Sequence, residues 1–209
     1  MDETLRNNLR DAYAKQVASR DSRIIEDWKI EDRARFLKIL QTEGKASLLE
    51  IGAGTGQDSI FFAKQGLKVT CIDLSPENVA SCREKGLDAQ VMDMCAIQFS
   101  PEIFDAAFAL NCLLHLPKSE FPVALEQVSK VLKVDGLFYL GQYGGNASEG
   151  VWEEDVYDPP RFFSFFTDEA IQSVVGKTFE VVSFKPIDLG GLGGQLHFQS
   201  LILRKHTET

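Results

Sequence analysis

The sequence predicts an α/β fold with a seven-stranded, mostly parallel sheet, an antiparallel C-terminal strand and helices on both faces. Short apolar runs alternate with amphipathic stretches along the chain, as in a parallel sheet with helical crossovers. Glycines at alternate positions, Gly52, Gly54 and Gly56, follow the first apolar run directly. The last two apolar runs lie too close together for a helical crossover, so they predict an antiparallel pair.

The N-terminal part of the chain predicts two helices and the first strand. Apolar side chains in residues 2–43 recur at spacings of three, four and seven, which is typical of amphipathic helices. Gly44 ends the second of these helices. Residues 48–51 are apolar enough for a buried strand, and a helix over about residues 56–65 follows the glycine turn.

The middle of the chain continues the alternation. Residues 67–72 predict the second strand, residues 76–85 a helix, and residues 88–92 the third strand. Residues 104–110 form a nearly continuous apolar run, which indicates a central strand buried on both faces. A helix with one apolar side is expected over residues 119–132.

The last third of the chain is expected to complete the sheet. The expected elements are a turn at 135–136, a fifth strand at 137–143, a helix beginning at Thr167, and closing strands at 179–184 and 195–203. The glycine-rich link at 190–194 joins the closing strands, so it is interpreted as a hairpin loop.

Size and composition predict one globular domain, residues 1–209. The chain has 44% hydrophobic and 25% charged residues, and 22 basic against 31 acidic side chains leave a net charge of −9. An acidic surface disfavours a nucleic-acid substrate. Neither a signal region nor a membrane span of about 18 apolar residues is found, so a cytoplasmic location is expected. A monomer or homodimer is expected. The four cysteines are scattered, which predicts no metal site.

The glycine turn predicts a site for an anionic or nucleotide ligand. Glycines allow backbone angles that other residues avoid, so a ligand can touch bare backbone there. The following helix directs unpaired N–H groups into the same crevice. The spacing of Gly52, Gly54 and Gly56 departs from the dinucleotide pattern, in which the third glycine comes three residues after the second. This departure disfavours NAD.

A carboxylate supports the same site. Asp73 ends the second predicted strand about 20 residues after Gly52, where a carboxylate can accept hydrogen bonds from both hydroxyls of an adenosine ribose. Asp73 could instead cap the next helix, although Ser75 and Pro76 already supply a start signal there.

Residues 50–56, Glu-Ile-Gly-Ala-Gly-Thr-Gly, resemble motif I of the class I S-adenosylmethionine-dependent methyltransferases. The Lys-Val-Asp-Gly-Leu run at 133–137 is also similar to what precedes strand five in that family. The resemblance covers about residue 45 to the C-terminus. It implies a Rossmann-like core at 45–209 behind an N-terminal helical cap at 1–44, with S-adenosylmethionine as cofactor and S-adenosylhomocysteine as product.

The resemblance also implies roles for individual residues. Asp93 would accept from the adenine amino group, while the Met94 N–H donates to the ring. Tyr13, near the end of a leading helix, would lie over the cofactor, although it could simply pack against the core. The cofactor-binding set is Tyr13, Glu50, Gly52, Ala53, Gly54, Gly56, Asp58, Asp73, Leu74, Ser75, Asp93, Met94, Asn111 and Cys112.

The end of the fourth strand is where this family places residues beside the methyl acceptor. His115 is the candidate general base, because the ordinary pKa of histidine lies near neutrality. It could also be a hydrogen-bonded turn residue without a chemical role. Cys112 is most simply a small buried residue at the strand end.

Residues 144–166 form a long segment that sits where the family builds an acceptor-site lid. Tyr143, Trp152, Arg161 and Phe162 are the candidate substrate residues. The Asp-Pro-Pro run at 158–160 resembles a motif of amino methyltransferases, but that motif belongs after strand four. The prolines are therefore interpreted as stiffening the segment.

The predicted activity is methyl transfer to an O, N, S or C nucleophile of a small molecule by direct in-line displacement. An NAD(P)-dependent reductase is the first alternative, yet no tyrosine has a lysine four residues later, as short-chain reductases require. A non-catalytic subunit that binds the cofactor is the second alternative.

Overall fold

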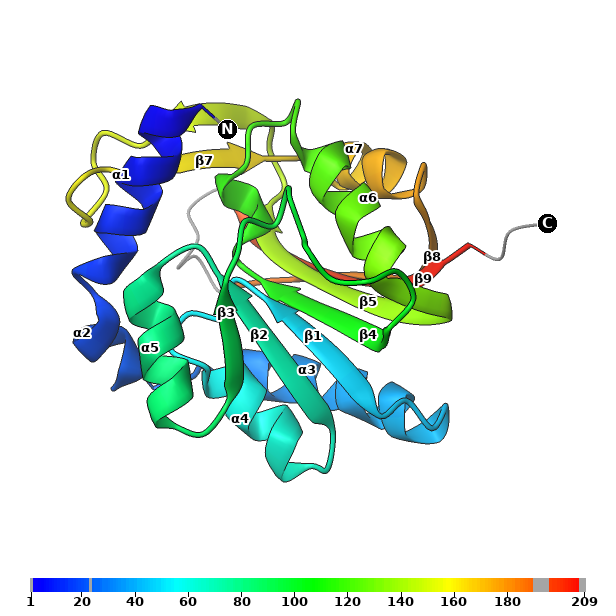
Figure 1. The fold of residues 1–209 in the computed structure, drawn as a ribbon. Coiled ribbons are helices and arrows are strands. Elements are labelled where there is room, and N and C mark those ends of the chain that lie inside the picture. Colours follow the sequence, from blue (N-terminus) through cyan, green and yellow to red (C-terminus); the bar gives the residue numbers. More distant parts are fainter. Residues whose placement is uncertain (1, 23, 190–195, 207–209) are drawn as a thin grey trace.

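A computed structural model describes residues 2–22, 24–189 and 196–206, and it contains one large sheet flanked by helices (Figure 1). The strands are β1 (Ser47–Ile51), β2 (Lys68–Asp73), β3 (Asp88–Val91), β4 (Phe104–Leu110), β5 (Leu132–Gly144), β6 (Ser148–Val151), β7 (Phe162–Phe165), β8 (Phe179–Ile187) and β9 (His197–Lys205). The helices are α1 (Glu3–Ala14), α2 (Val17–Asp21), α3 (Asp27–Thr42), α4 (Gln57–Lys64), α5 (Pro76–Glu84), η1 (Leu113–His115), α6 (Phe121–Val131) and α7 (Asp168–Val175).

The predicted sheet is confirmed. Its order is β3-β2-β1-β4-β5-β9-β8, and the strands β1 to β5 run parallel to one another. Strand β9 is antiparallel to both β5 and β8, so the last strand of the chain lies inside the sheet and β8 forms its edge. Strand order reverses between β1 and β4, and ligands bind at the carboxyl ends of the strands beside such a point.

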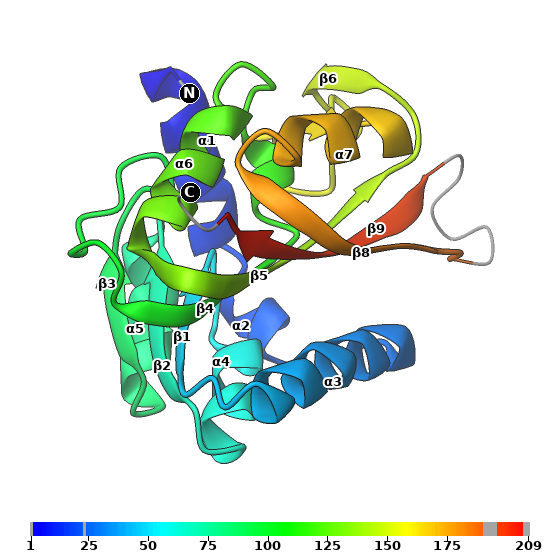
Figure 2. The same cartoon turned by 90° about the vertical axis from the view of Figure 1, so that its right-hand side faces the viewer.

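Helices cover both faces of the sheet, as expected (Figure 2). One hydrophobic core lies under α6 and α7 and includes Phe121, Leu125 and Ile171. The other lies under α3, α4 and α5 and includes Phe36 and Phe62. The sheet is thus buried on both faces, which explains why the central strands are apolar along their whole length.

Two local expectations are corrected, and a third falls outside the residues that the structure describes. Residues 2–43 form three helices instead of two, because the short helix α2 separates α1 from α3. Strand β5 begins at Leu132, directly after α6, so the predicted turn at 135–136 lies inside the strand as an irregularity with Asp135 at φ 58°. The expected hairpin loop at 190–194 lies outside the described residues.

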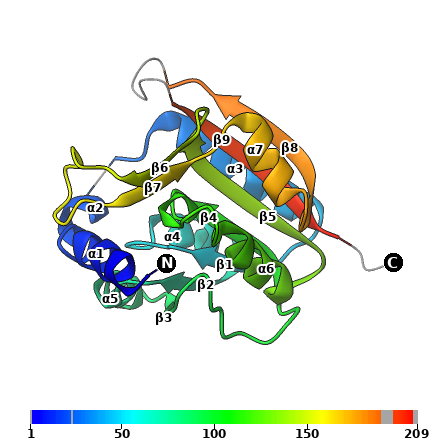
Figure 3. The same ribbon diagram turned by 90° about the horizontal axis from the view of Figure 1, so that it is seen from above.

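The segment at 144–166 also holds more structure than a loop. Strands β6 and β7 pair antiparallel as a separate two-stranded sheet, with Val151 opposite Phe162. Figure 3, seen from above, shows this hairpin beside α1, over one end of the main sheet. No described helix is both long and apolar enough to cross a bilayer.

Candidate functional site

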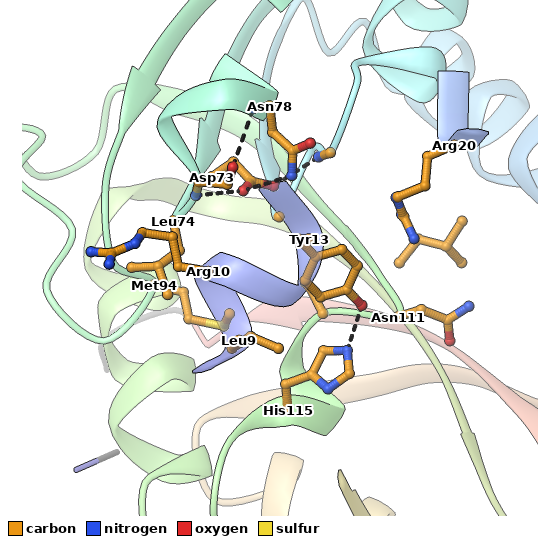
Figure 4. A pocket seen from close by; sticks show the side chains of 15 residues that line it. Leu9, Arg10, Tyr13, Arg20, Asp73, Leu74, Asn78, Met94, Asn111 and His115 are labelled. Atoms are coloured by element: carbon orange, nitrogen blue, oxygen red, sulfur yellow. Dashed lines mark hydrogen bonds between the residues drawn. The ribbon is translucent and has the colours of Figure 1, made fainter. Parts of the chain in front are cut away.

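Two adjoining cavities lie at the carboxyl ends of β1, β2 and β4, under α1. Their volumes, which include the part that is open to solvent, are ≈ 490 Å³ and ≈ 340 Å³. Both are lined by Leu9, Gly52, Asp73, Leu74 and Met94, so they form one continuous cleft. Figure 4 shows the larger cavity with Tyr13 and His115 on one side and Asp73 on the other. The cleft stands at the reversal of strand order described above.

The cleft brings together most of the predicted cofactor residues. The members that line it are Tyr13, Gly52, Gly54, Asp73, Leu74, Ser75, Asp93, Met94, Asn111 and Cys112, together with His115. These come from five separate parts of the chain. Their convergence follows from strand order, because parallel neighbours end at the same edge of the sheet.

The glycine turn needs its first glycine for two reasons. Gly52 has φ +66°, and a Cβ there would overlap Cβ of Cys112. The N–H groups of Gly52 and Ala53 both donate to the carbonyl oxygen of Ile72, at 2.8 and 3.1 Å, which ties the turn to β2. The turn therefore presents bare backbone to the cleft while its position is held by the neighbouring strand.

Asp73 holds the same turn through its carboxylate. The Gly54 N–H donates to Oδ2 at 2.8 Å, and Oδ1 accepts from the Ser75 N–H at 2.9 Å and from Nδ2 of Asn78 at 3.1 Å. One carboxylate thus joins the glycine turn, the end of β2 and the start of α5. Asp73 also lines both cavities.

Four predicted cofactor residues do not line the cleft, namely Glu50, Ala53, Gly56 and Asp58. Glu50 is buried in β1, where the Ser59 hydroxyl donates to its carboxyl. Burial, reinforced by Asp58, raises the pKa of Glu50 well above its ordinary value. Asp58 pairs with Nη1 of Arg33 at 2.6 Å. The contacts of Glu50 and Asp58 are thus with Ser59 of α4 and Arg33 of α3, and not with the cleft.

The helical cap contributes more of the cleft than Tyr13 alone. Arg6, Leu9, Arg10 and Tyr13 lie on one side of α1, at the spacing of successive helical turns, and all four line the cleft. Nε of Arg6 lies 3.0 Å from Oδ2 of Asp93, whose Oδ1 accepts from the Cys95 N–H at 2.8 Å. The spacing was visible in the sequence, but only the structure shows what this face covers.

Arg20 is a cation without a carboxylate partner among the described residues. Its guanidinium lies over the Tyr13 ring, 4.8 Å from the centroid, and lines the larger cavity. Its Nε is buried and has no hydrogen-bond partner within the described parts of the chain. Nη2 stands 3.5 Å from the place a Cβ on Gly54 would take. An anionic ligand group beside the glycine turn would supply the missing partner.

His115 makes two hydrogen bonds with its ring. Nδ1 lies 2.8 Å from the carbonyl oxygen of Phe162, which can only accept, so we assign the proton to Nδ1. Nε2 then accepts from the Tyr13 hydroxyl at 2.7 Å. Burial lowers the pKa of His115 to about 3, so the ring is neutral at pH 7. A direct role as base stays a prediction, and Tyr13 occupies the nitrogen that it would need.

The predicted acceptor residues divide into two groups. Arg161 donates from Nη1 to the Tyr13 hydroxyl at 3.1 Å and forms a bidentate pair with Asp155, at 2.7 and 2.8 Å. Phe162 reaches the site through its carbonyl group. Trp152 packs on Phe163 and is 52% exposed, and neither Trp152 nor Tyr143 lines the two cavities. The structure thus brings Arg161 and Phe162, but not the other two, to the cleft residues.

Comparison with known proteins agrees with this geometry. Residues 48–136 match the family model described as a methyltransferase domain. An uncharacterized methyltransferase of Schizosaccharomyces pombe is 32% identical over 125 residues, which are 56% of this chain and 47% of the relative. The ubiquinone/menaquinone biosynthesis C-methyltransferase UbiE of Zymomonas mobilis is 25% identical over 118 residues, or 52% of this chain and 47% of the relative. The chain spans about half the length of these curated relatives.

Solved structures show the same fold. The 1,6-didemethyltoxoflavin-N1-methyltransferase of Burkholderia thailandensis superposes with a TM-score of 0.72 at 21% identity, over 96% of this chain and 88% of that chain. Its crystals contain 1,6-didemethyltoxoflavin and S-adenosylhomocysteine. The predicted resemblance to the class I S-adenosylmethionine-dependent methyltransferases is confirmed, in sequence over residues 48–136 and in fold over most of the chain.

Proposed function

We propose, from the methyltransferase domain at residues 48–136, that this chain transfers the methyl group of S-adenosylmethionine to a small molecule. The observation that carries the proposal is the cleft under α1, where bare glycine backbone and Asp73 meet Arg20, whose buried Nε has no hydrogen-bond partner among the described residues. These groups are bare backbone, a carboxylate and a guanidinium, and each suits a different part of the cofactor. The ligands of a structural neighbour, S-adenosylhomocysteine and a small heterocycle, support the same assignment.

The cofactor's nucleoside end fits the sheet side of the cleft. Asp73 has lone pairs beyond its three protein contacts, and it is proposed to accept from the ribose hydroxyls. Asp93 and Met94 line the second cavity and are proposed to hold the adenine. Asp93 would do so while keeping its ion pair with Arg6, because each carboxylate oxygen can accept more than one hydrogen bond.

The amino-acid end of the cofactor fits the side of the cleft that α1 and α2 form. Its carboxylate is proposed to pair with Arg20, whose buried Nε has no partner within the described chain. Helix α4 begins at Gln57, directly after the glycine turn, and the positive end of its dipole adds a favourable field for the same anion. Arg20 is thus an addition to the cofactor-binding set expected from the sequence.

The bound cofactor supplies a methyl group already activated by its positive sulfur. The chain's own contribution is to hold two reactants in line and to exclude water. Hydrogen bonds link Tyr13 of α1 to His115 of η1 and to Arg161, and His115 in turn contacts the carbonyl oxygen of Phe162 in β7. These bonds are proposed to hold α1 over the cleft while the reactants are bound.

A small acceptor is proposed for two reasons. Residues of α1 cover the cleft, and the β6–β7 hairpin lies beside α1 (Figure 3), an arrangement that suits a small acceptor. The net charge of −9 also opposes the phosphates of a nucleic acid. The proposal covers acceptors with an O, N, S or C nucleophile, and the structure of the acceptor determines which of these atoms is methylated.

Calorimetry with S-adenosylhomocysteine and NADH tests the cofactor assignment. We expect S-adenosylhomocysteine to bind and NADH not to bind. Asp73→Asn should weaken S-adenosylhomocysteine about 10- to 100-fold, since it removes charge-assisted hydrogen bonds worth about 1.5–3 kcal/mol. Asp88→Asn is the control, because Asp88 accepts from Thr70 at the other end of the strands. Binding of NADH, or equal affinity of the Asp73 variant, would refute the assignment.

Turnover with a panel of thiols, phenols and amines tests catalysis itself. The readout is formation of S-adenosylhomocysteine from S-adenosylmethionine. Cofactor binding without turnover on any member of a broad panel would favour a non-catalytic subunit instead.

A further inference from the structure

The short helix α2 is held against the rest of the chain mainly by polar contacts. None of its residues is buried, and yet α2 carries Arg20, which lines the larger cavity. In most proteins a helix is held in place by burial of an apolar face. The position of α2, and with it the position of Arg20, therefore depends on contacts of another kind.

The first such contact is made by Lys85, which directly follows α5. Its ammonium group donates to Oδ1 of Asp21 at the end of α2 and to the carbonyl oxygen of Thr55 at 2.6 Å. The hydrogen bond from Lys85 lowers the pKa of Asp21, so the two side chains carry opposite charges at neutral pH. Thr55 lies between Gly54 and Gly56. One cation thus joins α2 to the backbone of the glycine turn.

Gln57 makes the second contact at the same place. Its Nε2 donates to the carbonyl oxygens of Arg20 and Asp21, at 3.3 and 3.0 Å. The last carbonyl groups of a helix have no partner within that helix, so Gln57 satisfies two of those at the end of α2. Gln57 is also the first residue of α4, directly after the glycine turn. We call these hydrogen bonds of Gln57 and Lys85 the α2 contacts.

The α2 contacts hold the backbone from which the Arg20 side chain extends. Nη2 of Arg20 stands 3.5 Å from the place that a Cβ on Gly54 would take. Its Nη1 lies 3.4 Å from the Tyr157 hydroxyl, which is a long hydrogen bond. A long side chain loses conformational entropy when it is ordered. The fixed backbone of Arg20 therefore determines how much time its guanidinium spends beside the glycine turn.

We propose that Lys85 and Gln57 are positioning residues for the cofactor, which place Arg20 by docking α2 on the glycine turn and so make the cleft selective for a nucleoside that bears an amino-acid carboxylate. This inference rests on the proposed function, in which Arg20 binds that carboxylate. Neither Lys85 nor Gln57 lines the two cavities. Both act through Arg20 and not by contact with the ligand.

Selectivity follows because α2 has a docked and an undocked state. A carboxylate gains its partner only when α2 is docked, so the apparent dissociation constant rises as the docked fraction falls. A ligand without the carboxylate interacts equally with both states, and its affinity does not depend on docking. General support of the glycine turn would instead affect both ligands alike.

Calorimetry with two ligands tests this inference. They are S-adenosylhomocysteine and S-adenosyl-3-thiopropylamine, which is the same molecule without its carboxylate. We expect the wild-type protein to bind S-adenosylhomocysteine at least about tenfold more tightly, because the analogue leaves the guanidinium of Arg20 without an ionic partner. This comparison measures the contribution of the carboxylate before any residue is changed.

Lys85→Met is the variant that removes one side of the α2 contacts. It should weaken S-adenosylhomocysteine about 3- to 10-fold and leave the analogue within about twofold of wild type. Asp21→Asn should act in the same direction. The double variant should be no weaker than Lys85→Met, because both changes break the same ion pair. Lys64→Met is the matched control, since Lys64 is an exposed lysine at the end of α4.

Hydrogen exchange of the amides in residues 17–21 measures docking directly. In the free protein these amides should exchange faster in Lys85→Met than in wild type, whereas Lys64→Met should match wild type. S-adenosylhomocysteine should slow their exchange in wild type, because two coupled equilibria influence each other equally. The analogue without the carboxylate should slow it less.

Four outcomes would overturn the inference. They are equal wild-type affinity for the two ligands, unchanged S-adenosylhomocysteine affinity in Lys85→Met, equal weakening of both ligands by that variant, and unchanged exchange of the α2 amides. Equal weakening would mean that Lys85 only supports the glycine turn. Failure of the wild-type protein to bind S-adenosylhomocysteine is a separate result, which would count against the proposed function instead.

Discussion

The hydroxyl of Tyr13 lies 2.7 Å from Nε2 of His115 and joins the N-terminal helix to the end of β4. Nη1 of Arg161 donates to the same hydroxyl at 3.1 Å, so three distant segments meet at one oxygen atom. This contact holds α1 over the cleft, although α1 is not part of the main sheet. It also determines the state of His115, because the nitrogen without a proton is the one that Tyr13 occupies.

Replacing Tyr13 by Phe should destabilise the protein and slow methyl transfer. The variant leaves Nε2 of His115 buried without its donor, which costs about 1–3 kcal/mol in the free energy of unfolding. Turnover should fall as well, because α1 loses its link to η1. Urea unfolding and S-adenosylhomocysteine formation are the measurements. Tyr157→Phe is the control, since that hydroxyl has only a 3.4 Å contact with Arg20. Equal effects of the two variants would argue against a specific Tyr13 link.

The stability of the protein should depend on pH through His115. Burial lowers the pKa of His115 to about 3, whereas an unfolded histidine takes up its proton near pH 6.5. The unfolded chain therefore binds one more proton between these values. The free energy of unfolding has its full value above about pH 6.5 and falls toward pH 3, by up to about 1.4 kcal/mol per pH unit.

Denaturant unfolding from pH 4.5 to 7.5 measures this slope. His115→Gln should flatten it, and His206→Gln, at an exposed position, should leave it unchanged. If wild type and His115→Gln lost stability in parallel as the pH fell, the buried neutral state assigned to His115 would be wrong.

Alanine at Gly52 should cost more stability than alanine at Gly66. Both glycines have positive φ, +66° and +91°, which costs about 1–2 kcal/mol for a residue with a Cβ. Among the described residues nothing lies within 4 Å of a Cβ at Gly66, whereas a Cβ at Gly52 meets Cys112. Overpacking adds about 1–3 kcal/mol at Gly52.

Calorimetry on the same pair of variants should show that only Gly52→Ala weakens S-adenosylhomocysteine, because only Gly52 lines the cleft. Similar cofactor affinities for the two variants would mean that the turn does not contact the ligand.

Arg161→Ala should impair the acceptor step and spare the cofactor. The guanidinium lies 3.6 Å from the centroid of Tyr157 and pairs with Asp155, so it orders the segment beside Tyr13. We expect turnover to fall about tenfold or more through lost positioning, with S-adenosylhomocysteine affinity within about twofold of wild type. Arg204→Ala, which breaks a bidentate pair with Glu43 far from the cleft, is the control. Unchanged acceptor affinity and turnover would remove Arg161 from the site.

Much of the fold could be predicted because its signals are local. Strand β4 was expected at 104–110 and is found there, since a strand buried on both faces reads as a continuous apolar run. Asp73 and Asp93 were expected at one sheet edge because each follows a strand of a parallel series. The helix after Thr167 begins where expected, with the Thr167 hydroxyl accepting from the Ala170 N–H.

The β6–β7 hairpin could not be predicted in the same way. Its strands are four residues each and pair across a ten-residue interval. The aromatic run at 162–165 reads equally well as core, loop or strand. What decides the matter is packing, because Phe163 lies on His115 with ring centroids 4.7 Å apart, and that neighbour comes from another part of the chain.

The sequence by itself determined the order of strands and helices, the glycine turn and the carboxylates at the strand ends, because each depends on neighbours a few residues away. Only the tertiary structure decided that α1 covers the cleft and that Arg20 lies beside the glycine turn, with no hydrogen-bond partner for its buried Nε among the described residues. Those relationships depend on sheet order and register, which bring together residues that no local periodicity connects.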